Sequence, residues 1–392
     1  MTRREWISGL PLGLALFDQT VENVQIAVAA ERSFGRELLR GIIERKPRQN
    51  VFISPLSVFL ALHMAENGAV GDTRTAMRKT LALPDLDAAA LNASTAALLA
   101  GLKSRNPDAL NIANALWADR RFTLDPEYLK LCTTLFGARA ATLDFRDARA
   151  AAEINDWVKA ETKGKIGNIV TADAVAKAAV ILTNAVYFAA SWRTEFSPSQ
   201  TQTAGFHLTG GGEKSVPMMH QPRIAGAYRA GGNFEGALLQ YKQSSIFLYA
   251  LLPREGKTPA EVLGSLDLEH LTGGAADFDL DVKIPRFSLD FSASLAEYLE
   301  KMGMGVAFHY PGADFRPMGS GEFVISDVIH KTRLEVDEKG TVAAAATAVT
   351  MTAAAMRQPH PVKTLVFDRP FVVLIGDSQT GALLFAGAIE NP

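Results

Sequence analysis

The residues best suited to a chemical role lie in one unusual segment, 338–355. It reads EKGTVAAAATAVTMTAAA, and from Gly340 onward it carries no charge and mostly small side chains. Alanine runs favour a helix, whereas the β-branched residues that interrupt them favour a strand. Small neutral residues occupy alternate positions: Thr341, Ala343, Ala345 and Thr347. This pattern can enter the core of a β-sheet without burying a charge. We therefore predict a segment that changes conformation, with Gly340 as its hinge.

Motifs that would indicate an enzyme are absent from the sequence. The run 210–215, GGGEKS, lacks the lysine directly after its last glycine that a phosphate loop needs, so it predicts a hairpin turn. Ser320 lies directly between two glycines and lacks the spacing of a nucleophile elbow. No two of the seven histidines have the close helical spacing of metal ligands. The sequence therefore predicts no catalytic residue, no metal site and no cofactor.

The composition predicts an ordered globular protein. The chain has 392 residues, of which 48% are hydrophobic and 21% charged. Its 40 basic and 42 acidic residues give a net charge of −2, so no overall field favours nucleic acid or an anionic membrane as a partner. The single cysteine, Cys132, excludes an intramolecular disulfide, and its apolar neighbours indicate a buried thiol.

Two interpretations of residues 1–29 remain open. Thr2-Arg3-Arg4 before the apolar run 7–17 resembles a twin-arginine export signal, with Ala27-Val28-Ala29 as the cleavage pattern. Alternatively, the segment is a tail that leads into a first helix. The apolar residues of that helix recur at helical spacing: Phe34, Leu38, Leu39 and Ile42. The first interpretation predicts a secreted or periplasmic protein and the second a cytoplasmic one. The length of the chain alone does not decide whether the remaining residues form one domain or two.

The hydrophobic patterns predict an α+β fold with large antiparallel parts, because helical and strand patterns do not alternate regularly. A buried helix is expected to begin at Ser54-Pro55 and to end at Gly68. Further helices are expected over 85–103, 126–136 and 148–162. Strands are expected over 180–188, 236–252 and 365–375, where β-branched and aromatic residues are bounded by glycine or proline.

The segment around the hinge resembles a known family. Residues 335–347, EVDEKGTVAAAAT, are similar almost residue for residue to the hinge of the serpins, a family of serine protease inhibitors. The resemblance continues in order along nearly the whole chain, through 50–57 (NVFISPLS), 110–115 (LNIANA), 154–158 (INDWV), 183–188 (TNAVYF), 216–219 (VPMM), 368–371 (DRPF) and 384–387 (LFAG). The chain is therefore identified as a member of this family from its sequence.

The resemblance implies that residues 30–392 form a single domain with a serpin fold of about three sheets and eight or nine helices, with an exposed reactive-centre loop at about 338–362. It also implies a function as a monomeric suicide inhibitor whose partner is a serine protease. The protease cleaves the loop, and the severed loop then inserts into the main sheet and traps the covalent acyl-enzyme. The alternative is a non-inhibitory serpin that acts as a carrier, chaperone or storage protein.

The same resemblance implies roles for residues of the loop. The residues that match the hinge are Glu338, Gly340, Thr341, Ala343, Ala344, Ala345 and Ala346. Their small uncharged side chains, from Gly340 onward, are typical of inhibitory members. The usual spacing from Glu338 places the reactive bond at Ala354-Ala355, which suits an elastase-like or subtilisin-like protease. Because the loop is longer than in compact members, a bond after Met356 or Arg357 stays an alternative, and Arg357 would favour trypsin-like enzymes.

Further matches lie in and around the main sheet. Ser54, Ser57, Asn184 and His330 match the family's shutter, a set of polar groups expected to form hydrogen bonds beneath the centre of the sheet. Trp192 matches the aromatic residue where the loop enters the sheet, and Arg286 is expected to pair with Glu338 there. Heparin is not expected as a partner, because the corresponding stretch 85–103 contains only one basic residue, Lys103.

Overall fold

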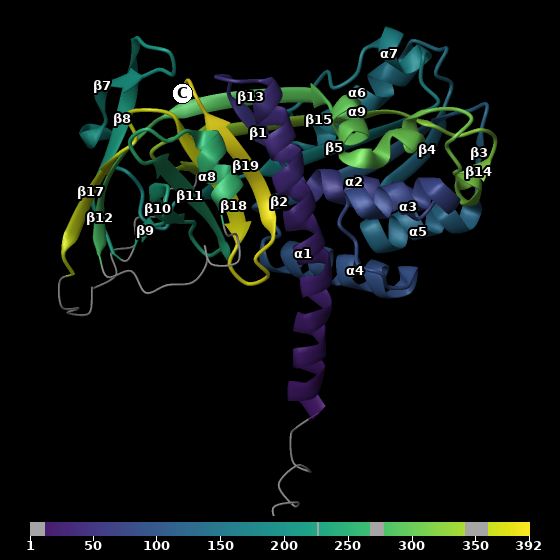
Figure 1. Ribbon diagram of the computed structural model, residues 1–392, viewed down its shortest axis with the longest axis horizontal. Coiled ribbons are helices and arrows are strands. Elements are labelled where there is room, and N and C mark those ends of the chain that lie inside the picture. Colours follow the sequence, from purple (N-terminus) through teal and green to yellow (C-terminus); the bar gives the residue numbers. More distant parts are fainter. Residues whose placement is uncertain (1–11, 226, 267–277, 342–359) are drawn as a thin grey trace, which may run out of the picture.

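The computed structural model describes residues 12–225, 227–266, 278–341 and 360–392 of the protein, with the side chains of the first helix described from Val24 onward. Most helices gather on one side of the molecule, two of the sheets lie on the other, and the largest sheet extends across both parts (Figure 1). The α+β fold predicted from the sequence is confirmed.

The described helices include all those predicted from the sequence. They are α1 (Leu12–Arg45), α2 (Pro55–Glu66), α3 (Gly71–Thr80), α4 (Ala88–Arg105), α5 (Pro126–Phe136), α6 (Arg149–Glu161), α7 (Ala172–Ala176), α8 (Pro259–Ser265) and α9 (Ala296–Leu299). Of these, α3, α7, α8 and α9 were not predicted. Local signals explain the starts of two of them: the side chains of Ser54 and Asp125 accept backbone N–H groups at the N-termini of α2 and α5, and proline follows each cap. Cys132 is buried in α5, and this burial raises the pKa of its thiol to about 11.

The largest sheet contains the strands around which the candidate site is built. Its strands are, in order across the sheet, β4 (Arg139–Leu143), β2 (Leu110–Asp119), β5 (Val180–Phe188), β15 (Ile325–Val336) and β13 (Phe287–Ser294). At one end of the sheet, β16 (Gly340–Thr341) lies between β15 and the short strand β6 (Ala190–Ser191), which follows β5 in the chain. The central pair, β5 and β15, runs parallel. Both faces of the sheet are covered, one by the main hydrophobic core around α2 and the other by a smaller core around α6.

Two further sheets and one ribbon complete the described part of the fold. The six-stranded sheet contains β1 (Val51–Ile53), β19 (Leu383–Ile389), β18 (Phe371–Asp377), β11 (Ile246–Pro253), β10 (Phe234–Gln240) and β9 (Tyr228–Ala230). The four-stranded sheet contains β17 (Val362–Val366), β12 (Asp279–Pro285), β8 (Glu213–Ile224) and β7 (Gln202–His207), and the ribbon pairs β14 (Gly319–Ser320) with β3 (Thr123–Leu124). The predicted hairpin turn at 210–215 is confirmed between β7 and β8.

Two of the strand predictions were wrong, because each predicted strand is divided into two. The segment 236–252 forms β10 and β11, which pair as a hairpin around a polar turn in which Gln243 has a φ of 51°. The segment 365–375 contains the end of β17 and the start of β18. Between them lies Pro370, which has no N–H to donate to a ladder and so cannot continue a central strand. The β-branched composition indicated that both segments contain strand residues, but it did not indicate the turns that divide them.

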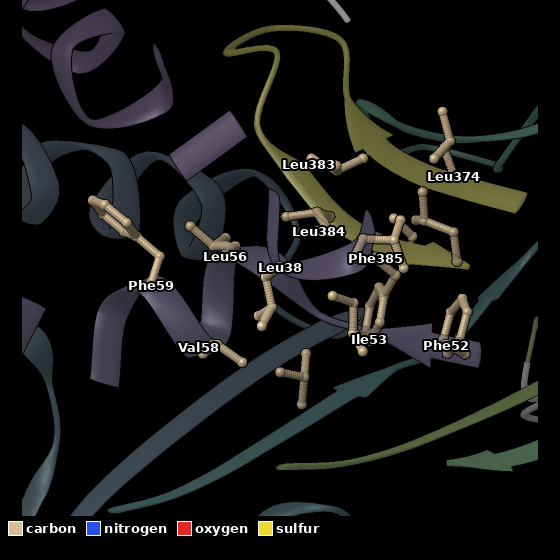
Figure 2. Close-up of a cluster of buried hydrophobic side chains, with 14 of the residues drawn as sticks. Leu38, Phe52, Ile53, Leu56, Val58, Phe59, Leu374, Leu383, Leu384 and Phe385 are labelled. Atoms are coloured by element: carbon tan, nitrogen blue, oxygen red, sulfur yellow. The ribbon is translucent and has the colours of Figure 1, made fainter. Parts of the chain in front are cut away.

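Helix α2 packs beneath the main sheet and is buried along its whole length. Its side chains meet those of α1, β1 and β19, and Figure 2 shows Leu38 of α1 with Ile53, Leu56 and Phe385 in one cluster. Phe52 and Phe385 stack with their ring centroids 5.3 Å apart. This packing fixes the start of α2, and with it Ser54 and Ser57, directly under the strands of the main sheet.

Helix α1 is continuous through the candidate cleavage pattern. Ala27 and Val28 are buried, and the N–H of Ala27 donates to Ser94 Oγ at 3.0 Å. None of the described helices, α1 included, is long and apolar enough to cross a membrane. Whether residues 1–29 form a separate segment stays a prediction.

A buried carboxyl group connects α1 to the hairpin between β18 and β19. Glu31 is fully buried, and its Oε2 accepts the N–H of Leu383 at 3.2 Å, while its Oε1 has no hydrogen-bond partner among the described residues. Burial raises the pKa of Glu31 to about 8, although the hydrogen bond and the charge of Arg32 oppose this effect. The native protein therefore holds Glu31 protonated at neutral pH.

We predict that Glu31→Gln reduces the pH dependence of stability. The pKa is about 8 in the fold and 4.5 for an ordinary glutamate, so the native state keeps a proton that the unfolded chain loses. Stability therefore falls as the pH rises from 4.5 to 8, and the loss is complete above 8. Urea unfolding of the wild type should show a lower midpoint at about pH 8.5 than at about pH 5.5, and the glutamine variant should show a smaller difference. Equal differences in both proteins would contradict this assignment.

Candidate functional site

The described start of the predicted mobile segment is already part of the main sheet. Strand β16 pairs antiparallel with β15 through Thr341 and Val336, and antiparallel with β6 through Gly340 with Ser191 and Thr341 with Ala190. The other residues predicted for the loop lie outside the described residues: Ala343, Ala344, Ala345, Ala346, Ala354, Ala355, Met356 and Arg357. The sheet thus holds Gly340 and Thr341, which lie beyond the last paired residues of β5 and β15.

Glycine is required at position 340 by close packing. A Cβ atom on Gly340 would lie 2.1 Å from the carbonyl oxygen of Ala190, which no side chain can tolerate. The preceding turn is held by Asp337, whose Oδ1 accepts the N–H groups of Lys339 at 2.8 Å and Gly340 at 3.0 Å. The chain therefore leaves β15, reverses in a tight turn and re-enters the sheet beside β6.

An aromatic pair forms the floor beneath β16. Trp192 and Tyr241 are buried and stack with ring centroids 4.5 Å apart at an angle of 14°. The indole N–H of Trp192 donates to the carbonyl oxygen of Asp337 at 2.9 Å. The hydroxyl of Tyr241 lies 2.5 Å from Thr341 Oγ1, and burial raises the pKa of Tyr241 far above its usual range. Sequence reasoning identified Trp192 but missed Tyr241, which carries no local signal and becomes its neighbour only through the fold.

Glu338 is held at the same end of the sheet by polar contacts. Its side chain is largely buried, and Oε1 accepts the hydroxyl of Thr201 at 2.8 Å. Nη1 of Arg286 lies 3.6 Å from the same oxygen, so the two residues predicted to pair are neighbours. Because half of the arginine side chain is exposed to water, this ion pair adds little stability. Its geometric effect is to connect the turn before β16 to the end of β12.

A second polar cluster lies beneath the middle of the sheet. His330 is fully buried: its Nε2 accepts the N–H of Ser54 at 3.0 Å, and its Nδ1 lies 3.1 Å from Asn184 Oδ1. Since Nε2 accepts, the proton of the neutral ring must lie on Nδ1 and is donated to Asn184. Burial lowers the pKa of His330 to about 3, so the ring stays neutral at physiological pH. Ser54 Oγ in turn donates to the carbonyl oxygen of Leu384 at 2.6 Å.

This cluster aligns three neighbouring strands. Asn114 of β2, Asn184 of β5 and His330 of β15 lie directly opposite one another in the strand register. Asn184 Nδ2 donates both to Asn114 Oδ1 and to the carbonyl oxygen of Ser57, the latter at 2.6 Å. Ser57 contributes this backbone oxygen, whereas its buried hydroxyl has no partner among the described residues. The sequence prediction did not include Asn114, although an asparagine within a buried strand pattern was a signal that could have identified it.

The segment 161–170, here called the strap, follows α6 and crosses the opposite face of the same strands. On one side, Asn111 Nδ2 of β2 donates to the carbonyl oxygen of Glu161 at 2.8 Å. On the other side, Lys331 Nζ of β15 donates to the carbonyl oxygen of Gly167 at 2.9 Å, and Lys165 pairs with Glu335 at 3.3 Å. The strap therefore bridges the line along which β5 and β15 meet.

The pairing between β5 and β15 stops before the strands end. The register runs from Ile325 with Val180 to Lys331 with Ala185, whereas β15 continues to Val336 and β5 to Phe188. The unpaired ends flank β16. Within the described residues, this arrangement presents no group of histidine, cysteine, aspartate or glutamate side chains that could hold a metal. What the geometry offers is a place for one more strand.

We predict that Asn184→Ala destabilises the native sheet strongly. The substitution leaves the Nδ1–H of His330 and the side chain of Asn114 without their described partner, and it removes the second hydrogen bond that the carbonyl oxygen of Ser57, already within α2, accepts. Unsatisfied buried groups of this kind lower the free energy of unfolding by about 3 kcal/mol or more in total. The matched control Asn114→Ala removes only the bond between the two asparagines and should cost about 1 kcal/mol. Similar losses in the two variants, measured by urea unfolding, would contradict a central position for Asn184.

Comparison with known proteins identifies the family. The family model described as Serpin (serine protease inhibitor) matches residues 29–392. A serpin-like protein of Thermococcus kodakarensis is 38% identical over 88% of this chain and 81% of its own length. Human leukocyte elastase inhibitor is 30% identical, over 93% of this chain and 99% of its own length.

Solved structures agree with this assignment. The thermophilic serpin tengpin in its native state has a TM-score of 0.82 and 29% identity, covering 93% of this chain and 94% of its own. A complex of thyroxine-binding globulin with thyroxine has a TM-score of 0.81 and 27% identity, covering 93% of this chain and 98% of its own. The matched fold, the strand order and the hinge beside β15 lead to one conclusion: the chain belongs to the serpin family.

Proposed function

We propose that this protein is an irreversible suicide-substrate inhibitor of serine proteases that acts as a monomer. Members of the serpin family are generally protease inhibitors rather than enzymes, and human leukocyte elastase inhibitor is among the relatives of the chain. The observation that carries the proposal is the position and direction of β16: it pairs antiparallel with the end of β15, so a strand extended from it in this direction would run between β5 and β15.

The topology favours insertion of the segment as a complete strand. β5 and β15 run parallel, and β16 runs antiparallel to β15. A strand that continued from β16 between them would be antiparallel to both neighbours. Insertion would replace one parallel ladder by two antiparallel ladders, which are more stable per residue and contain more hydrogen bonds. The uncleaved loop is tethered at both ends and cannot reach this arrangement, so free energy is stored until a protease cuts it.

The register of β16 predicts where each inserted residue would lie. Thr341 faces Val336 on one side and Ala190 on the other. When this register is continued without a bulge, Thr347 lies between His330 and Asn184. Its hydroxyl can replace the hydrogen bond that these two residues lose when the strands separate. Residues 343 and 345 share the core-facing side with Thr341, which agrees with their small neutral side chains.

The covalent step belongs to the protease. Its serine Oγ attacks the carbonyl carbon of Ala354 and transfers its proton through the protease histidine to the departing amine of Ala355. The peptide C–N bond breaks, and the loop remains attached to the serine as an ester. Insertion of the released segment then carries the protease along the sheet and distorts its catalytic site, so water does not hydrolyse the ester.

Specificity is proposed from the residue at the reactive bond. Alanine at position 354 fits the small pocket of an elastase-like or subtilisin-like protease, and the name of the leukocyte relative supports the first of these. A bond after Met356 or Arg357 stays the alternative within the lengthened loop. Arginine at the cleavage position would instead select trypsin-like enzymes.

A non-inhibitory role is the second candidate. The structural relatives include thyroxine-binding globulin, which was solved with thyroxine bound, so the fold also supports ligand carriage. Charged or bulky residues in the hinge would favour this role, but positions 340–346 carry glycine, threonine, valine and alanine only. The hinge composition therefore favours inhibition.

We predict that Ala345→Glu converts the inhibitor into a substrate. In the continued register this side chain faces the core, and insertion would bury its charge. The matched control is Ala344→Glu, which adds the same charge one residue earlier on the opposite face of the inserted strand. The control should retain covalent complex formation, whereas Ala345→Glu should be cleaved without forming the complex. If both variants trap the protease equally well, the proposed register is wrong.

The test of the proposed function is incubation of the purified protein with an elastase, a subtilisin and a trypsin. We expect a complex with the elastase or the subtilisin that survives SDS, and a released peptide whose sequence begins at Ala355. A peptide that begins one or more residues later would move the reactive bond towards Met356 or Arg357. Cleavage by all three enzymes without any stable complex would overturn inhibition in favour of the non-inhibitory candidate.

A further inference from the structure

A cleft of about 570 Å³ shares no lining residue with β16 or with either polar cluster of the main sheet. Its walls are the middle of α1, the end of α3 and the wide turn Glu300–Met304 that follows α9. Phe34 and Met302 contribute apolar surface to it, and Tyr298 contributes an aromatic ring. This volume is in the range of pockets that hold small organic molecules.

A glycine within α1 keeps the cleft open. A Cβ atom on Gly41 would meet no other atom within 4 Å, and Gly41 lines the cleft. Gly35 on the same helix is different, because its Cβ would lie 2.4 Å from the Cβ of Pro55 and packing therefore excludes a side chain. Glycine is less favourable than alanine within a helix. At Gly35, packing against Pro55 explains why the helix has a glycine. At Gly41 no neighbour requires a glycine, and the missing side chain leaves empty space in the cleft.

The opposite wall has an unusual backbone. Gly303 within the wide turn has a φ of 109°, and Ala82, just after α3, has a φ of 53° although it is not a glycine. The hydroxyl of Thr80 donates to the carbonyl oxygen of Met302 at 3.3 Å and so connects the two elements of this wall. Wide helical turns and left-handed non-glycine residues occur preferentially at binding sites.

Basic side chains outnumber acidic ones in the cleft. Four basic and two acidic residues line it. Arg40 is engaged with both acids, since it lies 2.5 Å from Glu37 and 4.0 Å from Glu44. Arg45 is engaged with Glu297 outside the lining, at 2.9 Å. Both arginines are therefore neutralised by carboxylates.

The two lysines of the cleft are not neutralised in this way. Within the described part of the chain, Lys79 and Lys301 form no hydrogen bond and no ion pair within 4.0 Å. Lys301 has a longer-range charge interaction with Glu297, whose carboxylate is itself bonded to Arg45. Each directly precedes a member of the bonded pair Thr80 and Met302, and both lysines line the cleft. The cleft thus combines two available positive charges with an apolar and aromatic surface.

We propose that this cleft binds a small organic anion with an apolar body. Lys79 and Lys301 recognise the acidic head, a carboxylate, sulfonate or phosphate, through charge-assisted hydrogen bonds. The body occupies the space above Gly41, against Met302 and Tyr298. The site is separate from the strands that move in the proposed inhibitory mechanism, so ligand occupancy and protease trapping can be measured independently.

Fluorescence titration with anilinonaphthalene sulfonate tests the proposal, because this probe joins a sulfonate to an aromatic body and brightens in apolar surroundings. The native protein should bind it saturably. Phenylnaphthylamine, which lacks the sulfonate, should bind about tenfold more weakly or less. The double variant Lys79→Ala/Lys301→Ala should likewise weaken binding of the sulfonate by about tenfold or more.

Two further variants separate loss of the site from loss of the fold. Gly41→Leu should abolish binding by filling the cleft, while the midpoint of thermal unfolding stays equal or rises because leucine is the better helix former. Lys130→Ala/Lys159→Ala removes two lysines from α5 and α6, which do not line the cleft, and should leave affinity unchanged. Unchanged binding in the Lys79/Lys301 double variant, equal affinity for the neutral probe, or no saturable binding by the native protein would each overturn the proposal.

Discussion

The direct parallel pairing of β5 with β15 is the constraint on which the rest of the structure depends. A strand that runs antiparallel to both would form better ladders, and the start of such a strand is already in place as β16. In the mechanism that we propose, the two strands stay together until a protease cuts the segment that follows β16. The fold is therefore organised around two strands that are paired directly but could be separated by one more strand.

The polar row Asn114, Asn184 and His330 explains how this arrangement is held. Its groups are buried, so any hydrogen bond lost as the strands separate leaves an expensive unsatisfied group. The row thus opposes early separation of the strands. In the register that we propose, the hydroxyl of Thr347 arrives at the same position and satisfies these groups again. The same side chains then both oppose separation of β5 from β15 before insertion and stabilise the expanded sheet after it.

Much of this could be predicted from the sequence, and the exceptions have physical reasons. The helix beginning at Pro55 and the strand 180–188 were predictable because capping residues and β-branched runs are local signals. The division of the segments 236–252 and 365–375 was missed, because the prediction relied on the many β-branched and aromatic residues and gave too little weight to a polar turn in the first segment and a single proline in the second. For the site, residues within the serpin motifs were identified, while Tyr241 and Thr201 reach the hinge only through tertiary packing. The cleft beside Gly41 was invisible, since its walls are far apart in sequence.

The strap gives the proposed insertion a fixed order of events. Adding a strand moves β15 away from β5 by about 4.8 Å, which is beyond the reach of any hydrogen bond that spans the line of separation. In the register of β16, Glu335 lies opposite residue 342, Lys331 opposite residue 346, and His330 opposite Thr347. As the segment advances, the strap must release either its contacts with β15, Lys165–Glu335 and Lys331–Gly167, or its contact with Asn111 of β2. The bond between Asn184 and His330 must break when residue 347 arrives. Sheet opening becomes a sequence of small ruptures at successive positions rather than a single large one, and it travels along β15 from the hinge end.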